Sequence, residues 1–160
     1  MSTTDYDSLV PIVAGVLHPD NISSKKHLSY YDFDGKTILV VDDILINLSL
    51  IEVFFRNTGA FLLFAVNGRE ALNSCISNPQ IDIVLMDIQM PVMNGLEATR
   101  EIRKYLPELP VIAITATVYA DDKQRCFDAG CNAFLSKPCS RKELLMTVNK
   151  YLTTNVLIEH

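Results

Sequence analysis

Residues 37–43, TILVVDD, define the first element of the fold: an apolar, β-branched run followed directly by two aspartates. A short run without polar positions is typical of a strand buried on both faces of a sheet. Similar short runs recur at 60–66, 81–86, 111–114 and 133–136. A stretch with helical character follows each run, so strand and helix alternate along the chain. This alternation predicts an α/β fold with a parallel sheet and helices on both faces.

Helices are expected between these strands, and their ends coincide with residues that start or stop helices. Gly59 closes the first helix, Asn78-Pro79 stops the second, and Ser140 caps the last. The expected helices are 45–57, 69–77, 95–106, 121–129 and 141–152.

Composition excludes several classes of protein. The chain has 160 residues with 49% hydrophobic residues, which suits one globular domain. Its net charge of −5 argues against direct nucleic-acid binding, which rewards clustered positive charge. Apolar runs stay well short of the roughly 18 residues of a membrane span, so we expect no membrane insertion. Four cysteines at irregular spacing fit no metal-ligand pattern, and we expect them to be reduced thiols in a cytoplasmic protein.

The N-terminal residues do not continue the strand–helix alternation. They are rich in Ser, Thr, Asp and Tyr, and we expect a linker or arm. The alternative is a strap docked on the domain by the apolar stretch 9–17 and by Tyr30, Tyr31 and Phe33. The expected regions are an arm at 1–35, a compact domain at 36–153 and a tail at 154–160.

Polar residues follow the predicted strands at one edge of the sheet. A sheet of this kind binds its ligands beyond the carboxyl ends of its strands. The residues found there are Asp42, Asp43, Asp87, Thr115 and Lys137. Three neighbouring carboxylates repel one another, and a hard divalent cation such as Mg²⁺ removes that penalty. A lysine and a hydroxyl suit phosphoryl oxygens, so the set predicts a phosphoryl-transfer site with an aspartate nucleophile.

Taken singly, each of these residues also has an ordinary structural interpretation. Asp42 and Asp43 would serve as helix caps, and Asp87 would end a strand at a loop. Thr115 is a common strand residue, and Lys137 would be a solvated lysine. Their joint occurrence at four strand ends of one sheet favours a shared site.

Four separated segments resemble the receiver domains of two-component response regulators. They are ILVVDD (38–43) with Asn47, VLMDIQMPVMNGLEATREIR (84–103), VIAITA (111–116) and AFLSKP (133–138), in the order and spacing of that family. The sequence around Asp87 is most similar to receivers carried by hybrid histidine kinases. The resemblance implies a doubly wound, five-stranded parallel sheet of the flavodoxin-like (βα)5 type, with strand order 2-1-3-4-5.

The resemblance also implies a role for each strand-end residue. Asp87 would accept a phosphoryl group from a phosphohistidine. Asp43 and Asp87 would ligate Mg²⁺ directly, Asp42 would do so through water, and the backbone carbonyl of Gln89 would complete the protein ligands. Lys137, followed by a cis peptide bond, would pair with the carboxylate and then with a phosphate oxygen.

Further positions would transmit or time the signal. The resemblance implies that Thr115 moves to the phosphoryl group and that Phe134 changes rotamer with activation, although ordinary core packing also explains Phe134. Gln89 and Thr117 would tune the lifetime of the acyl phosphate. Gly95 is expected at the mouth of the site, where a side chain would obstruct the backbone.

The expected partners follow from the same resemblance. A histidine kinase or phosphotransfer protein would supply the phosphoryl group, and a protein effector or parent kinase domains would read the switched surface. We expect no conventional enzyme activity beyond self-phosphorylation and self-dephosphorylation. The chain is either a stand-alone regulator or a receiver from a hybrid histidine kinase, tethered through a membrane-bound parent. The oligomeric state stays open, because some receivers form homodimers.

Two other functions share part of this chemistry. A Mg²⁺-dependent phosphatase with an aspartyl nucleophile needs a second carboxylate two residues later, where this chain has Gln89. A receiver-like interaction module that no longer accepts phosphate usually lacks an acidic or lysine residue of the set, and all are present here.

Overall fold

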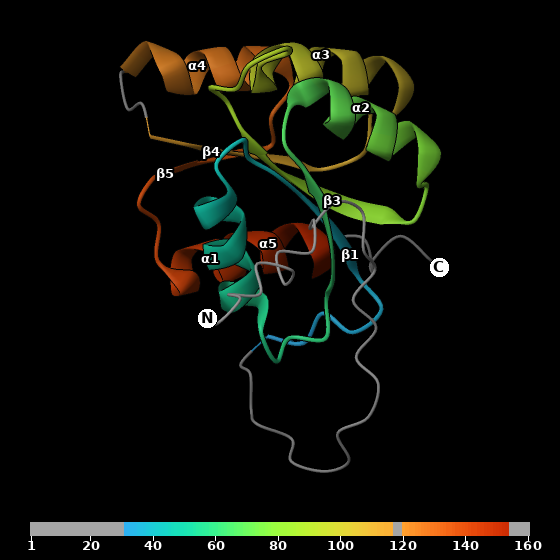
Figure 1. Cartoon of the computed structure of the whole chain (residues 1–160), viewed down its shortest axis with the longest axis vertical. Coiled ribbons are helices and arrows are strands. Elements are labelled where there is room, and N and C mark those ends of the chain that lie inside the picture. The colour runs from blue at the N-terminus through green and yellow to red at the C-terminus, as the bar shows by residue number, and fades with distance from the viewer. Residues whose placement is uncertain (1–30, 117–119, 154–160) are drawn as a thin grey trace, which may run out of the picture.

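The computed structural model describes residues 31–116 and 120–153 as five strands and five helices (Figure 1). The strands are β1 (Thr37–Val41), β2 (Phe61–Ala65), β3 (Ile81–Asp87), β4 (Val111–Thr115) and β5 (Ala133–Ser136). The helices are α1 (Leu45–Phe55), α2 (Gly68–Ser77), α3 (Gly95–Tyr105), α4 (Ala120–Ala129) and α5 (Arg141–Thr153). All strand pairs are parallel, in the order β2-β1-β3-β4-β5. The predicted fold class and strand order are therefore confirmed.

Helices cover both faces of the sheet and create two hydrophobic cores. α1 and α5 pack on one face, and α2, α3 and α4 pack on the other (Figure 1). Successive strand residues alternate between the cores: Leu39 of β1 lies in the core under α2 and α3, whereas Ile38 and Val40 lie in the core under α1 and α5. This two-sided burial explains why the strands are continuous apolar runs.

The first helix is shorter than predicted. It ends at Phe55 rather than at residue 57, and Asn57 then adopts a positive φ of 63°. The hydroxyl of Thr58 donates to the Phe55 carbonyl (2.7 Å), and Arg141 Nε donates to the Phe54 carbonyl (2.7 Å). Because these donors satisfy the last carbonyls, the helix stops without a further turn. Most of the other predicted ends agree with the observed ones to within about one residue.

Residues 31–35 pack against the turn between α1 and β2. Phe33 is only 2% exposed, its backbone N–H donates to the Thr58 carbonyl (2.6 Å), and its ring lies 6.0 Å from that of Phe55. Tyr31 stacks on Phe33 at 6.0 Å. These contacts agree with the docked alternative for Tyr31 and Phe33. The stretch 9–17, Tyr30 and the tail 154–160 lie outside the described residues.

The structure contains the helix cap predicted at Ser140 and free cysteines. The hydroxyl of Ser140 accepts from the Glu143 N–H, and Glu143 accepts from the Ser140 N–H, which makes the predicted cap of α5. All four cysteines are free thiols.

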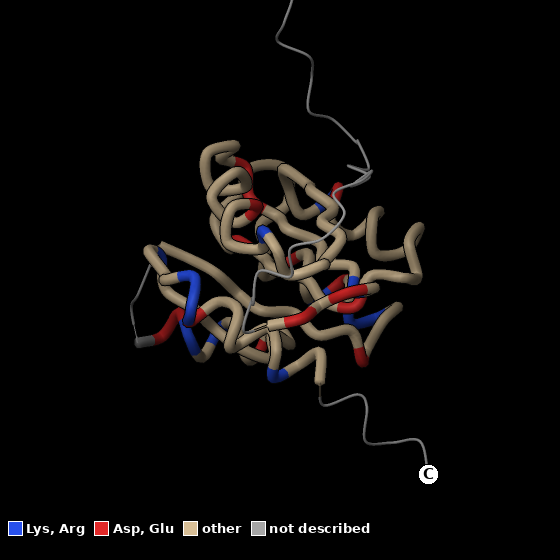
Figure 2. Tube along the Cα trace, turned by 90° about the horizontal axis from the view of Figure 1, so that it is seen from below, with Lys and Arg blue, Asp and Glu red and all other residues tan. Residues whose placement is uncertain are grey.

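Lys and Arg are interspersed with Asp and Glu along the trace (Figure 2). Within the described part of the chain, no helix has the length and apolar character needed to cross a bilayer.

Candidate functional site

Four strands bring the predicted residues to one edge of the sheet. Asp42 follows β1, Asp87 ends β3, Thr115 ends β4, and Lys137 follows β5. Carboxylate oxygens of Asp42, Asp43 and Asp87 all lie within 4.8 Å of one another. Neither Asp42 nor Asp43 caps α1, whose N-terminal flanking residue makes no side-chain cap. The helix-cap interpretation of these aspartates is therefore wrong, and the shared site is present.

Asp42 is the most firmly held of the three carboxylates. It is 1% exposed, and its Oδ1 accepts from the Ile44 backbone N–H at 2.9 Å. The side-chain amide of Asn47 donates to both carboxylate oxygens at 3.1 Å, and Lys137 Nζ contacts Oδ2 at 2.5 Å. The sequence alone indicates no role for Asn47, which the structure places against Asp42. Asn47 fixes the orientation of Asp42.

Lys137 joins the two buried aspartates. Its Nζ lies 3.2 Å from Asp87 Oδ1 as well as in contact with Asp42. Burial raises the pKa of Asp87, with the charge of Lys137 opposing the rise and that of Asp42 adding to it. Burial alone would lower the pKa of Lys137, but the hydrogen bond to Asp42 and the attraction to Asp87 outweigh it and raise that pKa. Lys137 is therefore held as a cation.

The lysine reaches the site because of the local backbone. The Lys137 N–H donates to the Thr115 carbonyl (2.8 Å), which extends the pairing of β4 and β5 by one residue. The Lys137-Pro138 peptide bond is cis, as expected. Thr115 itself is 2% exposed at the end of β4. The threonine and the lysine are thus placed side by side by one strand pair.

The loop after Asp87 closes tightly over the end of β3. The Gly95 N–H donates to the Ile88 carbonyl (2.9 Å), and a Cβ on Gly95 would lie 2.0 Å from the Asp87 carbonyl oxygen. The absence of a side chain is therefore required at this position, as predicted. Asn94 and Glu97 form a reciprocal cap that starts α3 directly behind the loop. Together these contacts fix the backbone around Asp87.

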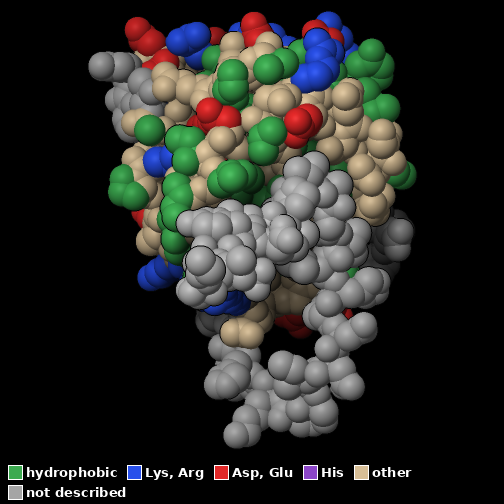
Figure 3. Space-filling view, viewed as in Figure 1, with side chains coloured by type: hydrophobic (Ala, Val, Ile, Leu, Met, Phe, Trp, Pro, Cys, Tyr) green, Lys and Arg blue, Asp and Glu red, His purple; other side chains and the backbone are tan. Residues whose placement is uncertain are grey.

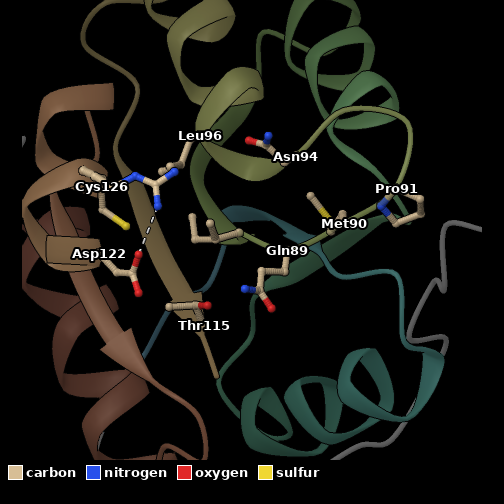
Figure 4. A pocket seen from close by; sticks show the side chains of 10 residues that line it. Gln89, Met90, Pro91, Asn94, Leu96, Thr115, Asp122 and Cys126 are labelled. Carbon is tan, nitrogen blue, oxygen red and sulfur yellow. Dashed lines mark hydrogen bonds and ion pairs between the residues drawn. The ribbon is translucent and has the colours of Figure 1, made fainter. Parts of the chain in front are cut away.

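A hollow of about 400 Å³ opens between the β3–α3 loop and α4, and its lining includes Ile88, the residue after Asp87. Figure 4 shows the side chains of Thr115 and Gln89 facing each other in it. Asp122 and Arg125 form an ion pair at its α4 wall (3.2 Å). The hollow is large enough to admit a group bigger than a water molecule next to Thr115.

The remaining predicted residues have different outcomes. Gln89 is exposed and lines the hollow, two residues after Asp87 in the sequence. Phe134 is half-buried against the core under α3 and α4, in agreement with the packing interpretation of its ring. Thr117 lies outside the described residues.

The charges of this site favour binding of a divalent cation together with phosphoryl oxygens. One lysine faces three carboxylates, so two negative charges remain uncompensated in a largely buried cluster. Closely spaced carboxylate oxygens are the ligands that Mg²⁺ prefers, and a divalent cation would neutralise the excess. With that charge balanced, the lysine and the threonine hydroxyl can hold phosphoryl oxygens next to Asp87.

A parallel 2-1-3-4-5 sheet defines the phosphoacceptor class of signalling domains when acidic residues follow β1 and end β3, a threonine ends β4 and a lysine follows β5. The chain belongs to the response regulator receiver domain family, whose sequence model matches residues 38–149. It is a receiver domain of two-component phosphorelay systems, and its relatives include the receivers of sensor histidine kinases.

One such relative is the sensor histidine kinase RcsC of Escherichia coli K12. The two are 38% identical over 133 residues, which cover 83% of this chain and 14% of the kinase. The chain thus spans less than a sixth of that protein's length.

Solved receiver structures have the same fold. The receiver domain of sensor histidine kinase PA1611 from Pseudomonas aeruginosa PAO1, with magnesium coordinated in its active site cleft, superimposes with a TM-score of 0.69 at 35% identity. That match covers 74% of this chain and 98% of the other. The receiver of Saccharomyces cerevisiae Ssk1, solved with the phosphotransfer protein Ypd1, gives a TM-score of 0.71 at 27% identity, over 78% and 93% of the chains.

Proposed function

We propose that Asp87 is the phosphoacceptor of this receiver. The observation that carries the proposal is the position of Lys137 Nζ, 2.5 Å from Asp42 and 3.2 Å from Asp87. Asp87 is the carboxylate that contacts the lysine, belongs to the acidic cluster and directly precedes Ile88, which lines the hollow together with Thr115. Asp42, in contrast, has both oxygens occupied by Asn47 and Lys137.

Mg²⁺ is the cofactor that this donor set fits. Asp43 and Asp87 would bind it directly, Asp42 through water, and the backbone carbonyl of Gln89 would add a further oxygen. The ion would neutralise the two excess negative charges and orient the incoming phosphoryl oxygens. The magnesium reported in the PA1611 receiver supports this assignment.

The reaction needs few protein groups. A carboxylate oxygen of Asp87 attacks the phosphorus of a phosphohistidine, forming a P–O bond as the P–N bond breaks. The electron pair of the broken bond stays on the imidazole nitrogen, which takes a proton from water. Lys137 leaves its contact with Asp87 for a phosphoryl oxygen, and the Thr115 hydroxyl donates to another. Thr115 and Phe134 would then change the surface over α4 and β5 that an effector, or another domain of a parent kinase, reads.

The phosphoryl donor would dock on the exposed side of α1. Ile46, Leu50 and Val53 recur at i, i+4 and i+7, which places them on one stripe, and Ile46 is 73% exposed. Figure 3 shows hydrophobic side chains gathered on this face. The stripe begins beside Asp43, so a helix-bearing donor seated on it brings its phosphohistidine to the acidic cluster. The solved complex of the Ssk1 receiver with Ypd1 supports a histidine phosphotransfer protein as the partner.

Intact mass spectrometry tests the acceptor. The full chain is incubated with Mg²⁺ and a small acyl phosphate as wild type, as Asp87→Asn and as Asp128→Asn, a matched charge change on the exposed side of α4. One phosphoryl group should appear on wild type and Asp128→Asn alone. Labelling of Asp87→Asn would contradict the assignment. If wild type stays unlabelled, binding of a beryllofluoride mimic distinguishes rapid self-hydrolysis from a module that does not accept phosphate.

A second experiment tests the docking stripe. Leu50→Asp is compared with Met146→Asp, an equally exposed position on α5, using a phosphorylated histidine phosphotransfer protein that labels the wild-type chain. Transfer from the protein donor should fall at least tenfold for Leu50→Asp only, while labelling by the small donor stays unchanged. Equal transfer to both variants would remove the α1 stripe from the proposal.

A further inference from the structure

The β2 edge of the sheet is unusually open to another strand. Within the described residues β2 pairs only with β1, in continuous register and without a bulge. Its sequence, FLLFA, has no charge and no proline, and Phe61 is 41% exposed. Proteins normally protect such an edge with lysine, proline or a bulge, or by covering it. This edge has none of the first three protections.

The backbone of β2 shows which groups face outward. The Phe61 N–H donates to the Lys36 carbonyl, and the Ala65 carbonyl accepts from the Asp42 N–H, so these residues bond towards β1. Because hydrogen-bonding direction alternates along a parallel strand, the N–H and carbonyl groups of Leu62 and Phe64 point to the open side. They are the groups that an added strand would bind.

The chain reaches the domain at the beginning of this edge. Phe33 is anchored to the Thr58 carbonyl, three residues before β2, and Asp34 lies against Gly59, where an added Cβ would approach Asp34 Cα to 3.0 Å. The described part of the chain therefore begins next to the N-terminal end of β2.

The residues before 31 contain a segment suited to an edge. The stretch 9–17, LVPIVAGVL, is uncharged, and four of its nine residues are β-branched. Pro11 and Gly15 disfavour a helix, while an edge strand tolerates proline. The 13 residues at 18–30 form a mainly polar tether whose mean span of about 20 Å matches the length of β2, about 17 Å. Such a tether gives an effective concentration in the millimolar range, which favours this segment over a second copy.

We propose that residues 9–17 pair with the outward edge of β2 as a sixth strand of the sheet. The pairing would satisfy the backbone groups of Leu62 and Phe64 and cover the exposed side chain of Phe61. It would also keep two copies of the domain from joining edge to edge.

Amide hydrogen exchange at single-residue resolution tests this pairing in the full chain. Wild type is compared with Ile12→Asp/Val13→Asp and with the control Ile22→Asp/Leu28→Asp, which adds the same charge within the tether. The Leu62 and Phe64 amides should exchange at least tenfold faster in the first variant than in wild type or control. Amides of the central strand β3 report whether each variant is folded.

Two results would overturn the proposal. One is equal exchange of the Leu62 and Phe64 amides in wild type and in the Ile12→Asp/Val13→Asp variant. The other is protection of these amides that rises with protein concentration and persists in that variant, together with a dimer in analytical ultracentrifugation. That second result would assign the edge to another copy of the chain.

Discussion

Replacing the phosphoacceptor candidate by its amide should make the metal-free protein more stable. Burial is the largest penalty on the charge of Asp87, and its carboxylate also lies within 4.8 Å of that of the buried Asp42, a pair that repels by about 3.5 kcal/mol at an effective dielectric constant of about 20; water screens the exposed Asp43. The ion pair with Lys137 at 3.2 Å returns about 5 kcal/mol. With a burial cost of several kcal/mol added, the charge on Asp87 costs on the order of 2 kcal/mol, and Asp87→Asn should raise the melting temperature by about 6–10 °C in a domain of this size.

The pH dependence of this gain identifies its cause. Burial, reinforced by Asp42, raises the pKa of Asp87 above its ordinary 3.8 in the folded protein. A raised carboxyl pKa means that stability is fully present below about pH 4 and is lost as the pH rises through the folded-state value. The advantage of Asp87→Asn should therefore be near zero at about pH 4 and complete at neutral pH.

Thermal unfolding with a chelator, from pH 4 to pH 8, measures the effect. Asp128→Asn is the control, since it makes the same charge change away from the cluster. Added Mg²⁺ should stabilise wild type and Asp128→Asn, and should stabilise Asp87→Asn much less because the amide replaces a charged ligand. An Asp87→Asn variant that is no more stable than wild type at pH 7 without metal would refute the argument that burial and repulsion penalise the charge of Asp87.

Three further substitutions test the backbone and its supports by urea denaturation. Gly95→Ala should cost about 2–3 kcal/mol because its Cβ would lie 2.0 Å from the Asp87 carbonyl oxygen, and an unchanged midpoint would contradict this close approach. Val92→Gly should raise the free energy of unfolding by about 1 kcal/mol, because Val92 adopts a positive φ of 69° that strains a β-branched residue; a lower free energy of unfolding would show that this strain is small. Arg103→Lys should lower the free energy of unfolding by about 2 kcal/mol, because lysine lacks the forked guanidinium that donates to the Gly130 carbonyl (2.8 Å). An unchanged free energy of unfolding would show that this contact does not stabilise the fold.

The sequence predicted most of this architecture because its signals are local. Apolar runs located every strand, and the βα alternation placed Asp42, Asp87 and Lys137 at one edge before any coordinates were known. Contacts between distant segments were not predictable in the same way. The early end of α1 depends on Arg141, and the burial of Phe33 depends on a ring and a carbonyl more than 20 residues away. No short sequence pattern signals such partners.

The same repulsion that lowers the stability of the empty site raises its affinity for a cation. By linkage, free energy that Mg²⁺ relieves on binding is added to its binding free energy, and about 2 kcal/mol corresponds to about 30-fold in affinity. Asp42 contributes less of this energy because Asn47 and Lys137 already neutralise and orient it. Asp87 has a raised pKa and a longer contact with Lys137 than Asp42 has, so its negative charge is the less well compensated of the two. The proposed phosphoacceptor is thus also the residue whose charge most strongly couples stability to metal binding.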